Sequence, residues 1–257
     1  MKYLLEHNDK KYSNFDLIKT FENLGIKKGD ILCVHSELFN FGIPLLKKNE
    51  FLQTIIDCFF EAIGKEGTLI MPTFTYSFCK NEVYDKLNSY TKMGALNEYF
   101  RKCEGVKRTN DPIFSFAIKG AKQNLFLKDT KSCFGENCVY DVLTKENGKL
   151  INFGNTESFT YIHFPEEIVK ISYRYNKIFK GIIIDENQKK YKKEINFFVR
   201  HEGLYPDGNK IRNFLIQNKN YKKIHFANAD IACVNVQKLY QQSIKAFKVN
   251  NNIFLQN

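Results

Sequence analysis

The chain alternates between short apolar runs and amphipathic stretches, and this alternation restricts the possible folds more than any other feature. Residues 31–34 (ILCV) and 68–72 (TLIMP) are almost wholly apolar, which is typical of strands buried on both faces. Between them, residues 51–64 place apolar side chains at helical spacing and end on Gly64. Strands that alternate with helices in this way predict an α/β sheet covered on both faces.

Further expected helices and strands follow one another along the rest of the chain. Ser13 is a typical helix cap and Gly25 a typical helix stop, so a helix is expected between them. From Ile171 the residues become β-branched and aromatic around a polar turn at 185–190, which predicts a long hairpin or β insertion over about 171–200. Further elements are expected as a helix from Gly94, strands from Ile113 and over 149–154, and a final helix over 236–247. We therefore expect one domain over residues 1–257, a three-layer α/β/α fold with a central mixed sheet and a β-hairpin excursion in its C-terminal third.

Composition restricts the class of protein. No run approaches the roughly 18 apolar residues of a membrane helix, and the N-terminal residues lack the pattern of a secretory signal. The seven cysteines include no CxxC pair, so we expect reduced thiols and no metal site. A cytoplasmic protein that does not bind membranes is the expectation.

The formal net charge of +11 is compatible with a nucleic-acid binder or with an enzyme for anionic ligands. The lysine pairs are spread over the whole chain, however, and no nucleic-acid-binding module is recognisable. We therefore expect no nucleic-acid partner, and we expect the charge to favour an anionic small molecule.

Five segments lie where open α/β sheets usually carry chemistry, beyond the carboxyl ends of strands. Each alone is explained equally well as a polar strand exit or a turn. They are residues 34–42 (VHSELFNFG), 71–75 (MPTFT), 106–120 (VKRTNDPIFSFAIKG), 133–143 (CFGENCVYDVL) and 149–169 (KLINFGNTESFTYIHFPEEIV).

Taken in order, these segments resemble the aminoglycoside 3-N-acetyltransferase family. The resemblance covers residues 13 to 170 and is thin beyond Ile171. It rests on Val34-His35-Ser36 with Leu38, on Gly67-Thr68-Leu69 through Thr75, on Arg108, Pro112, Ser115, Ala117 and Gly120, on Phe134-Gly135, and on Gly148-Lys149, Gly154, Thr160, His163 and Glu166.

The resemblance implies transfer of an acyl group from an acyl-CoA, expected to be acetyl-CoA, to an amine on a sugar. It assigns the cofactor to the first loop and to the strand exits that follow, and it places the acceptor near the third and fifth segments. The implied cofactor residues are His35, Ser36, Glu37, Leu38, Thr73, Phe74, Thr75 and Ser115, and the implied substrate residues are Asp111, Thr160 and Glu167. The chain departs from the family pattern at Glu37, Asp111, Cys138 and Pro165.

His163 and Glu166 are the expected catalytic pair. An amine must lose a proton to attack a thioester, and histidine is the side chain whose ordinary pKa suits that task. Pro165 fits the first turn of a helix, which places the helix start at about 162–164 with Glu166 within reach of the ring. The helix dipole would lower the pKa of His163 and Glu166 would raise it. A solvent-facing His–Glu pair at a helix start is the alternative, and Cys138 as a nucleophile has little support.

For the acceptor, the positive charge favours a nucleotide-linked amino-deoxy sugar, as used in surface-glycan biosynthesis. An aminoglycoside, with acetylation conferring antibiotic resistance, is the alternative. A non-catalytic relative that binds nucleic acid is a second alternative, from another class of function. The oligomeric state is open, with a homodimer as one option.

Overall fold

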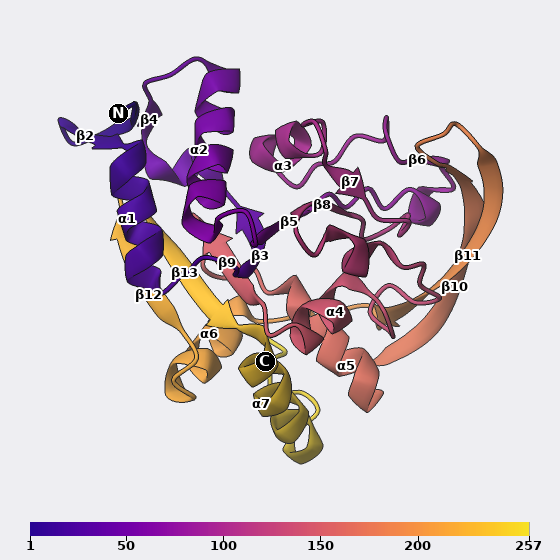
Figure 1. The fold of residues 1–257 in the computed structure, drawn as a ribbon. Coiled ribbons are helices and arrows are strands. Elements are labelled where there is room, and N and C mark those ends of the chain that lie inside the picture. Colours follow the sequence, from indigo (N-terminus) through magenta and orange to yellow (C-terminus); the bar gives the residue numbers. More distant parts are fainter. Residues whose placement is uncertain (257) are drawn as a thin grey trace.

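The computed structural model describes residues 1–256 and builds them around a seven-stranded sheet (Figure 1). Three parallel strands form its centre, and the outer strands on both sides are antiparallel. The strand order is β12-β13-β9-β3-β5-β8-β7. The strands are β3 (Ile31–Ser36), β5 (Thr68–Pro72), β7 (Lys107–Arg108), β8 (Phe116–Gly120), β9 (Lys149–Phe153), β12 (Lys222–Phe226) and β13 (Ala229–Asn235).

Helices cover both faces of this sheet, which confirms the predicted three-layer arrangement. Successive residues of β3 point to opposite faces, so Ile31 and Cys33 join one core while Leu32 and Val34 join the other. The first core is closed by α4 (Val139–Lys145), α5 (His163–Val169), α6 (Gly208–Gln217) and α7 (Val236–Val249), and the second by α1 (Asn14–Leu24), α2 (Lys48–Ile63) and α3 (Ala95–Phe100).

Local signals explain where these helices begin and end. Ser13 and Asp16 form a reciprocal capping box at the start of α1, and Gly25 ends that helix in the left-handed conformation. Helix α2 starts at Lys48, three residues before the predicted start, and its last residue precedes Gly64. None of the helices within residues 1–256 is long and apolar enough to cross a bilayer.

The predicted β insertion is a hairpin of β10 (Arg174–Ile184) and β11 (Lys190–Arg200). It curves along one side of the molecule (Figure 1) and pairs at its far end with β6 (Tyr84–Asp85). Another small sheet, of β1 (Tyr3–His7), β2 (Lys10–Ser13) and β4 (Ile43–Pro44), was not predicted. The remaining short elements are the 3-10 turns η1 (Leu38–Phe41), η2 (Phe78–Lys80), η3 (Gln123–Leu127) and η4 (Thr160–Ile162). That residues 1–257 form one domain stays a prediction.

Candidate functional site

His163 and Glu166 lie one turn apart at the start of α5, in direct contact. The helix begins at His163, within the predicted 162–164, and Pro165 occupies its first turn. The Nδ1 atom of His163 lies 2.9 Å from Oε2 of Glu166. The side chains are 15% and 2% exposed, so the pair is not the solvent-facing alternative.

Two side chains from the base of the hairpin complete this cluster, and neither was predicted. Arg174 Nη2 lies 2.7 Å from His163 Nδ1 and 2.7 Å from Glu166 Oε2. The Tyr173 hydroxyl donates to the other carboxylate oxygen, Oε1, at 2.5 Å. Arg174 is also held by the carbonyl of Phe198 on the opposite strand, at 2.8 Å from Nη1.

The protonation states follow from these contacts. Burial, followed by the charge of Arg174, lowers the pKa of His163 to about 4, against the opposing influence of Glu166. Burial acts to raise the pKa of Glu166, but the contacts with His163, Arg174 and Tyr173 outweigh it and lower that pKa. Near neutral pH the pair is therefore a neutral imidazole beside an ionised carboxylate.

These contacts decide the direction of the pKa shift of His163, which the sequence left open. The dipole at the helix start was expected to compete with Glu166 for control of His163. A 3-10 turn, Thr160–Ile162, runs directly into α5, so His163 already lies within a helical stretch. Burial and the charge of Arg174 lower the pKa of His163 and keep the ring neutral.

The first of the five segments, residues 34–42, is connected to the cluster of His163 and Glu166 by aromatic rings. The Tyr140 hydroxyl lies 3.2 Å from Nε2 of His35, the Tyr140 ring lies parallel to Phe134, and Phe134 packs edge to face against His163 with centroids 5.1 Å apart. Burial lowers the pKa of His35 to about 4. The fold thus connects the expected cofactor loop with the expected base, although they are far apart in sequence.

The rest of the first loop is fixed by neighbouring segments. The Ser36 hydroxyl bonds Asn97 Oδ1 of α3 at 2.6 Å. Leu38 packs on the second core, and the Glu37 N–H donates to the carbonyl of Phe153 at 2.8 Å. Gly154 has φ +91°, and a β-carbon there would overlap the Glu37 carbonyl.

Thr73 and Ser115, two of the expected cofactor residues, are fully buried around Arg108. The Nε of Arg108 donates to both hydroxyls, at 3.0 and 3.2 Å, and the Ser115 hydroxyl donates to the Thr73 carbonyl at 2.6 Å. Phe74 is buried against Phe114. These buried contacts fix the positions of the residues that follow β5 and precede β8.

Thr75 and the expected substrate residues lie at three separate places. The Thr75 hydroxyl donates to the Pro112 carbonyl at 3.0 Å. Asp111 accepts the N–H groups of Ile113 and Phe114, each at 2.8 Å, so its Oδ1 already closes a turn. Thr160 lines a cavity of about 210 Å³ together with His163, whereas Glu167 lines one of about 460 Å³.

Glu167 is held by the Ser132 hydroxyl, which donates to its Oε1 at 2.6 Å. Burial raises the pKa of Glu167 against the effects of Ser132 and the nearby cations. Its cavity is lined by Asp129 and Glu136 as well as by Lys131 and Lys170, so neither sign of charge dominates there.

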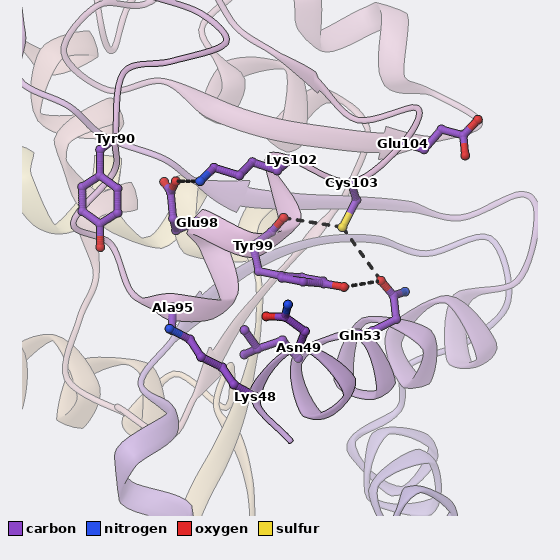
Figure 2. A pocket seen from close by; sticks show the side chains of 11 residues that line it. Lys48, Asn49, Gln53, Tyr90, Ala95, Glu98, Tyr99, Lys102, Cys103 and Glu104 are labelled. Atoms are coloured by element: carbon purple, nitrogen blue, oxygen red, sulfur yellow. Dashed lines mark hydrogen bonds and ion pairs between the residues drawn. The ribbon is translucent and has the colours of Figure 1, made fainter. Parts of the chain in front are cut away.

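The largest of the cavities described here, about 700 Å³, lies between α2 and α3 (Figure 2). Lys48 comes from the first turn of α2, Glu98 and Tyr99 come from α3, and Lys102 comes from the turn that follows α3. Figure 2 shows the Tyr99 hydroxyl and the Cys103 thiol both directed at Gln53. His163 does not line this cavity, but α3, which forms one wall, also holds Ser36 through Asn97.

The cysteines are unsuited to nucleophilic or metal chemistry. All seven are free thiols, and burial raises the pKa of both Cys133 and Cys138 well above the ordinary thiol value. Cys138 instead caps α4, accepting the Asp141 N–H at 3.3 Å. In the described part of the chain, no cluster of three His, Cys, Asp or Glu residues is placed to hold a metal ion.

Known proteins resemble the chain in sequence and in fold. An aminoglycoside N(3')-acetyltransferase-like protein, YokD, from an SPbeta prophage of Bacillus subtilis (strain 168), is 25% identical over 226 residues, 77% of this chain and 80% of that protein. Aminoglycoside N(3)-acetyltransferase IV of Salmonella sp is 27% identical over 163 residues, 62% of this chain and 60% of that protein. AAC-IIIb in a binary complex with CoASH has a similar fold, with a TM-score of 0.80 and 18% identity over 93% of this chain and 97% of that chain.

The family model described as aminoglycoside 3-N-acetyltransferase matches residues 33–248, which include His163, Glu166, Tyr173 and Arg174. The chain therefore belongs to the aminoglycoside 3-N-acetyltransferase family, whose members are acyltransferases that use acetyl-CoA.

Proposed function

We propose that the chain acetylates an amino group of an aminoglycoside, with His163 as the general base. The observation that carries this proposal is the buried contact between a neutral His163 and an ionised Glu166. A base must be unprotonated to accept the amine proton, and the low pKa of His163 keeps it so at neutral pH.

The residues of the cluster have separate tasks in this reaction. Acetyl-CoA supplies a thioester carbon that the amine attacks. His163 uses Nε2, because its Nδ1 is turned to Glu166 and Arg174. It takes the proton from the attacking amine and returns it to the sulfur that leaves. Glu166 accepts the Nδ1–H and stabilises the ring while it carries the extra proton.

For the cofactor, we infer two regions of this chain. The loop at His35–Leu38 is linked to His163 through two rings, Tyr140 and Phe134, and would receive the acyl end. The cavity between α2 and α3 offers the ammonium group of Lys48 for a phosphate and two tyrosine rings for an adenine, Tyr90 and Tyr99, while the ammonium group of Lys102 is paired with Glu98 at 2.7 Å (Figure 2). Its volume of about 700 Å³ falls in the range of ligand sites.

The acceptor proposed here is the alternative of the sequence analysis, because the reason for preferring a nucleotide-linked sugar is weakened. That preference rested on the net charge of +11. Residues 171–200 hold eight Lys and Arg against three Asp and Glu, a net +5, so nearly half of the charge belongs to the hairpin. The cavity at Glu167 has no excess of cations, and the similar proteins are named for aminoglycosides. The cytoplasmic location stays a prediction.

The test is an assay of CoA release with purified protein, acetyl-CoA and two classes of acceptor. Turnover of gentamicin or neamine, without turnover of UDP-linked amino sugars, is the expected result. Turnover of the nucleotide-linked sugars alone would overturn the proposed acceptor. Failure to release CoA with any amine, together with salt-sensitive binding of DNA, would favour the nucleic-acid-binding alternative.

Replacing His163 tests the base. We expect His163→Ala to lower kcat/KM at least about a hundredfold, the scale on which general bases contribute. Binding of CoA, measured by calorimetry, should be retained, because His163 lies outside both proposed cofactor regions. His201→Ala is the matched control, since His201 follows β11 outside the cluster. Wild-type turnover in the His163→Ala variant would exclude the assigned base.

A further inference from the structure

The unusual member of the cluster is Arg174, because it contacts both partners of the His–Glu pair with one nitrogen. Its Nη2 lies 2.7 Å from His163 Nδ1 and 2.7 Å from Glu166 Oε2. The side chain is 1% exposed, and its Nη1 is tied to the Phe198 carbonyl. A guanidinium that is buried and held on two sides has little freedom to leave this position.

A buried carboxylate needs a positive partner, and a neighbouring histidine that supplies this positive charge can no longer act as a base. Glu166 is 2% exposed, so leaving it ionised without a cation would be costly. If His163 were the only available cation, the pair would settle as imidazolium and carboxylate. An imidazolium has no lone pair on Nε2 and cannot accept a proton from an amine.

We propose that Arg174 is a positioning residue that supplies the positive charge required by Glu166, so that His163 enters each catalytic cycle neutral. The proposal rests on the proposed function only for the use of His163 as a base. Arg174 acts on Glu166 by an ion pair and on His163 by repulsion, because the imidazolium and the guanidinium would lie in direct contact.

Glu166 also selects between the two neutral forms of the ring. With the proton on Nδ1, the ring donates to Glu166 and leaves Nε2 free as a base. With the proton on Nε2, the ring would accept from Arg174 and could not act as a base. Arg174 and Tyr173 already donate to Glu166, and only the first form adds a third donor, so the working form is the one that gives the carboxylate its full set of donors.

The charged and titratable groups around His163 are few. Glu166 lies on the same helix, Arg174 starts β10 and Arg200 ends β11, while Tyr173 bonds Glu166. Arg174 and Arg200 face each other in the register of the hairpin. Arg200 also acts to lower the pKa of His163, but only Arg174 contacts the ring. Arg200 is therefore a matched control of equal charge without the contact.

The experiment is a pH titration of His163 by NMR of the imidazole nitrogens. The signals of His163 are assigned among the five histidines by comparison with His163→Ala. In the wild-type protein the proposal requires a pKa below the ordinary value of about 6.5. A wild-type pKa above that value would mean an ion pair and would overturn the proposal without any variant of Arg174.

Arg174→Gln should raise the pKa of His163 by about one to three units, the usual effect of one adjacent charge. Arg174→Lys keeps the charge and should leave the pKa close to that of the wild type. Arg200→Gln should shift it less than Arg174→Gln does. A folded Arg174→Gln protein with an unchanged His163, or an equal shift in Arg200→Gln, would contradict the proposal.

Kinetics supply a second readout that a merely structural role would not move. The ratio of variant to wild-type kcat/KM cancels the titration of the acceptor amine. For Arg174→Gln this ratio should fall as the pH drops below the raised pKa, whereas a variant that is only destabilised gives a constant ratio. Because the NMR titration needs no acceptor, its success together with a lack of acetyl transfer would count against the proposed function alone.

Discussion

Gly154 and Gly25 share a left-handed backbone, but only Gly154 lies against another segment. Their φ angles are +91° and +88°. A β-carbon at Gly25 would meet nothing within 4 Å, whereas one at Gly154 would overlap the Glu37 carbonyl in the expected cofactor loop. Gly154 thus permits the close approach of that loop to the end of β9.

Alanine substitutions at Gly25 and Gly154 should distinguish the cost of a strained backbone from the cost of a steric clash. Gly25→Ala is expected to lower the free energy of unfolding by about 1 kcal/mol, the usual cost of a left-handed alanine. Gly154→Ala should cost more than about 2 kcal/mol, because the Glu37 loop must also move. It should weaken CoA binding, which Gly25→Ala should not. Urea denaturation and calorimetry measure both effects, and equal costs would contradict the role given to the loop.

Single residues also mark how far sequence can predict a site. The family resemblance singles out His163 and Glu166, and their contact is predictable because both lie on one helix, three residues apart. Arg174 and Tyr173 lie across a turn from that helix, and no periodicity brings a strand residue to a helix residue. Asp111 was expected at the substrate, but sequence does not reveal that its Oδ1 is used by two N–H groups of its own turn.

Among the elements, β9 joins the central sheet to the helices of one face. Phe153 at its end contacts the rings of Phe41, Phe21 and Phe59, with centroids 4.5 to 6.1 Å apart. Phe21 belongs to α1 and Phe59 to α2, so one side chain joins the strand to both helices of that face.

Phe153→Ala should therefore be among the costly core substitutions. The expected loss is about 3–5 kcal/mol in the free energy of unfolding, the range for removing a buried phenylalanine. Phe15→Ala on α1, where the side chain is 58% exposed, should change it by less than about 0.5 kcal/mol. Chemical denaturation of both variants checks this, and similar midpoints would argue against the aromatic cluster as the joint between β9 and the helices α1 and α2.

Strands with mainly apolar residues were predicted from the sequence, whereas other elements were missed or began at a different residue. The buried runs of β3, β5 and β9 were recognised because all or most of their residues are apolar. The strand expected from Ile113 begins only at Phe116, because Asp111 holds Ile113 and Phe114 in a turn. Strand β12 was missed because most of its residues are polar or exposed. Helix α6 was missed although its buried residues Ile211 and Leu215 lie at helical spacing.

For the whole molecule, two buried neutral histidines link folding to pH. The folded pKa of both His35 and His163 is about 4, below the value of about 6.5 expected when unfolded. The unfolded chain therefore binds protons more readily between these values. Stability contributed by the neutral rings is complete above about pH 6.5 and is lost as the pH falls toward 4.

Urea denaturation from pH 7 to pH 5 should show this loss. The expected slope is about 1 kcal/mol per pH unit for each histidine. His35→Gln removes one of the two groups and should make the dependence shallower. A free energy of unfolding that stays level over this range in the wild-type protein would show that the rings are not buried as neutral groups.

The packing of α7 has a consequence for the order in which the molecule is assembled during synthesis. Helix α7 lies against both α4 and α5, and β13, which leads into it, pairs with β9. The chain near His163 therefore emerges from the ribosome about 70 residues before the helix that supports it. Until α7 has been synthesised, α5 lacks the helix against which it packs, and His163 and Glu166 are not yet held in place beside Arg174. Acetyl transfer should thus begin only after the last strand and helix have docked, well after the local hairpin has closed.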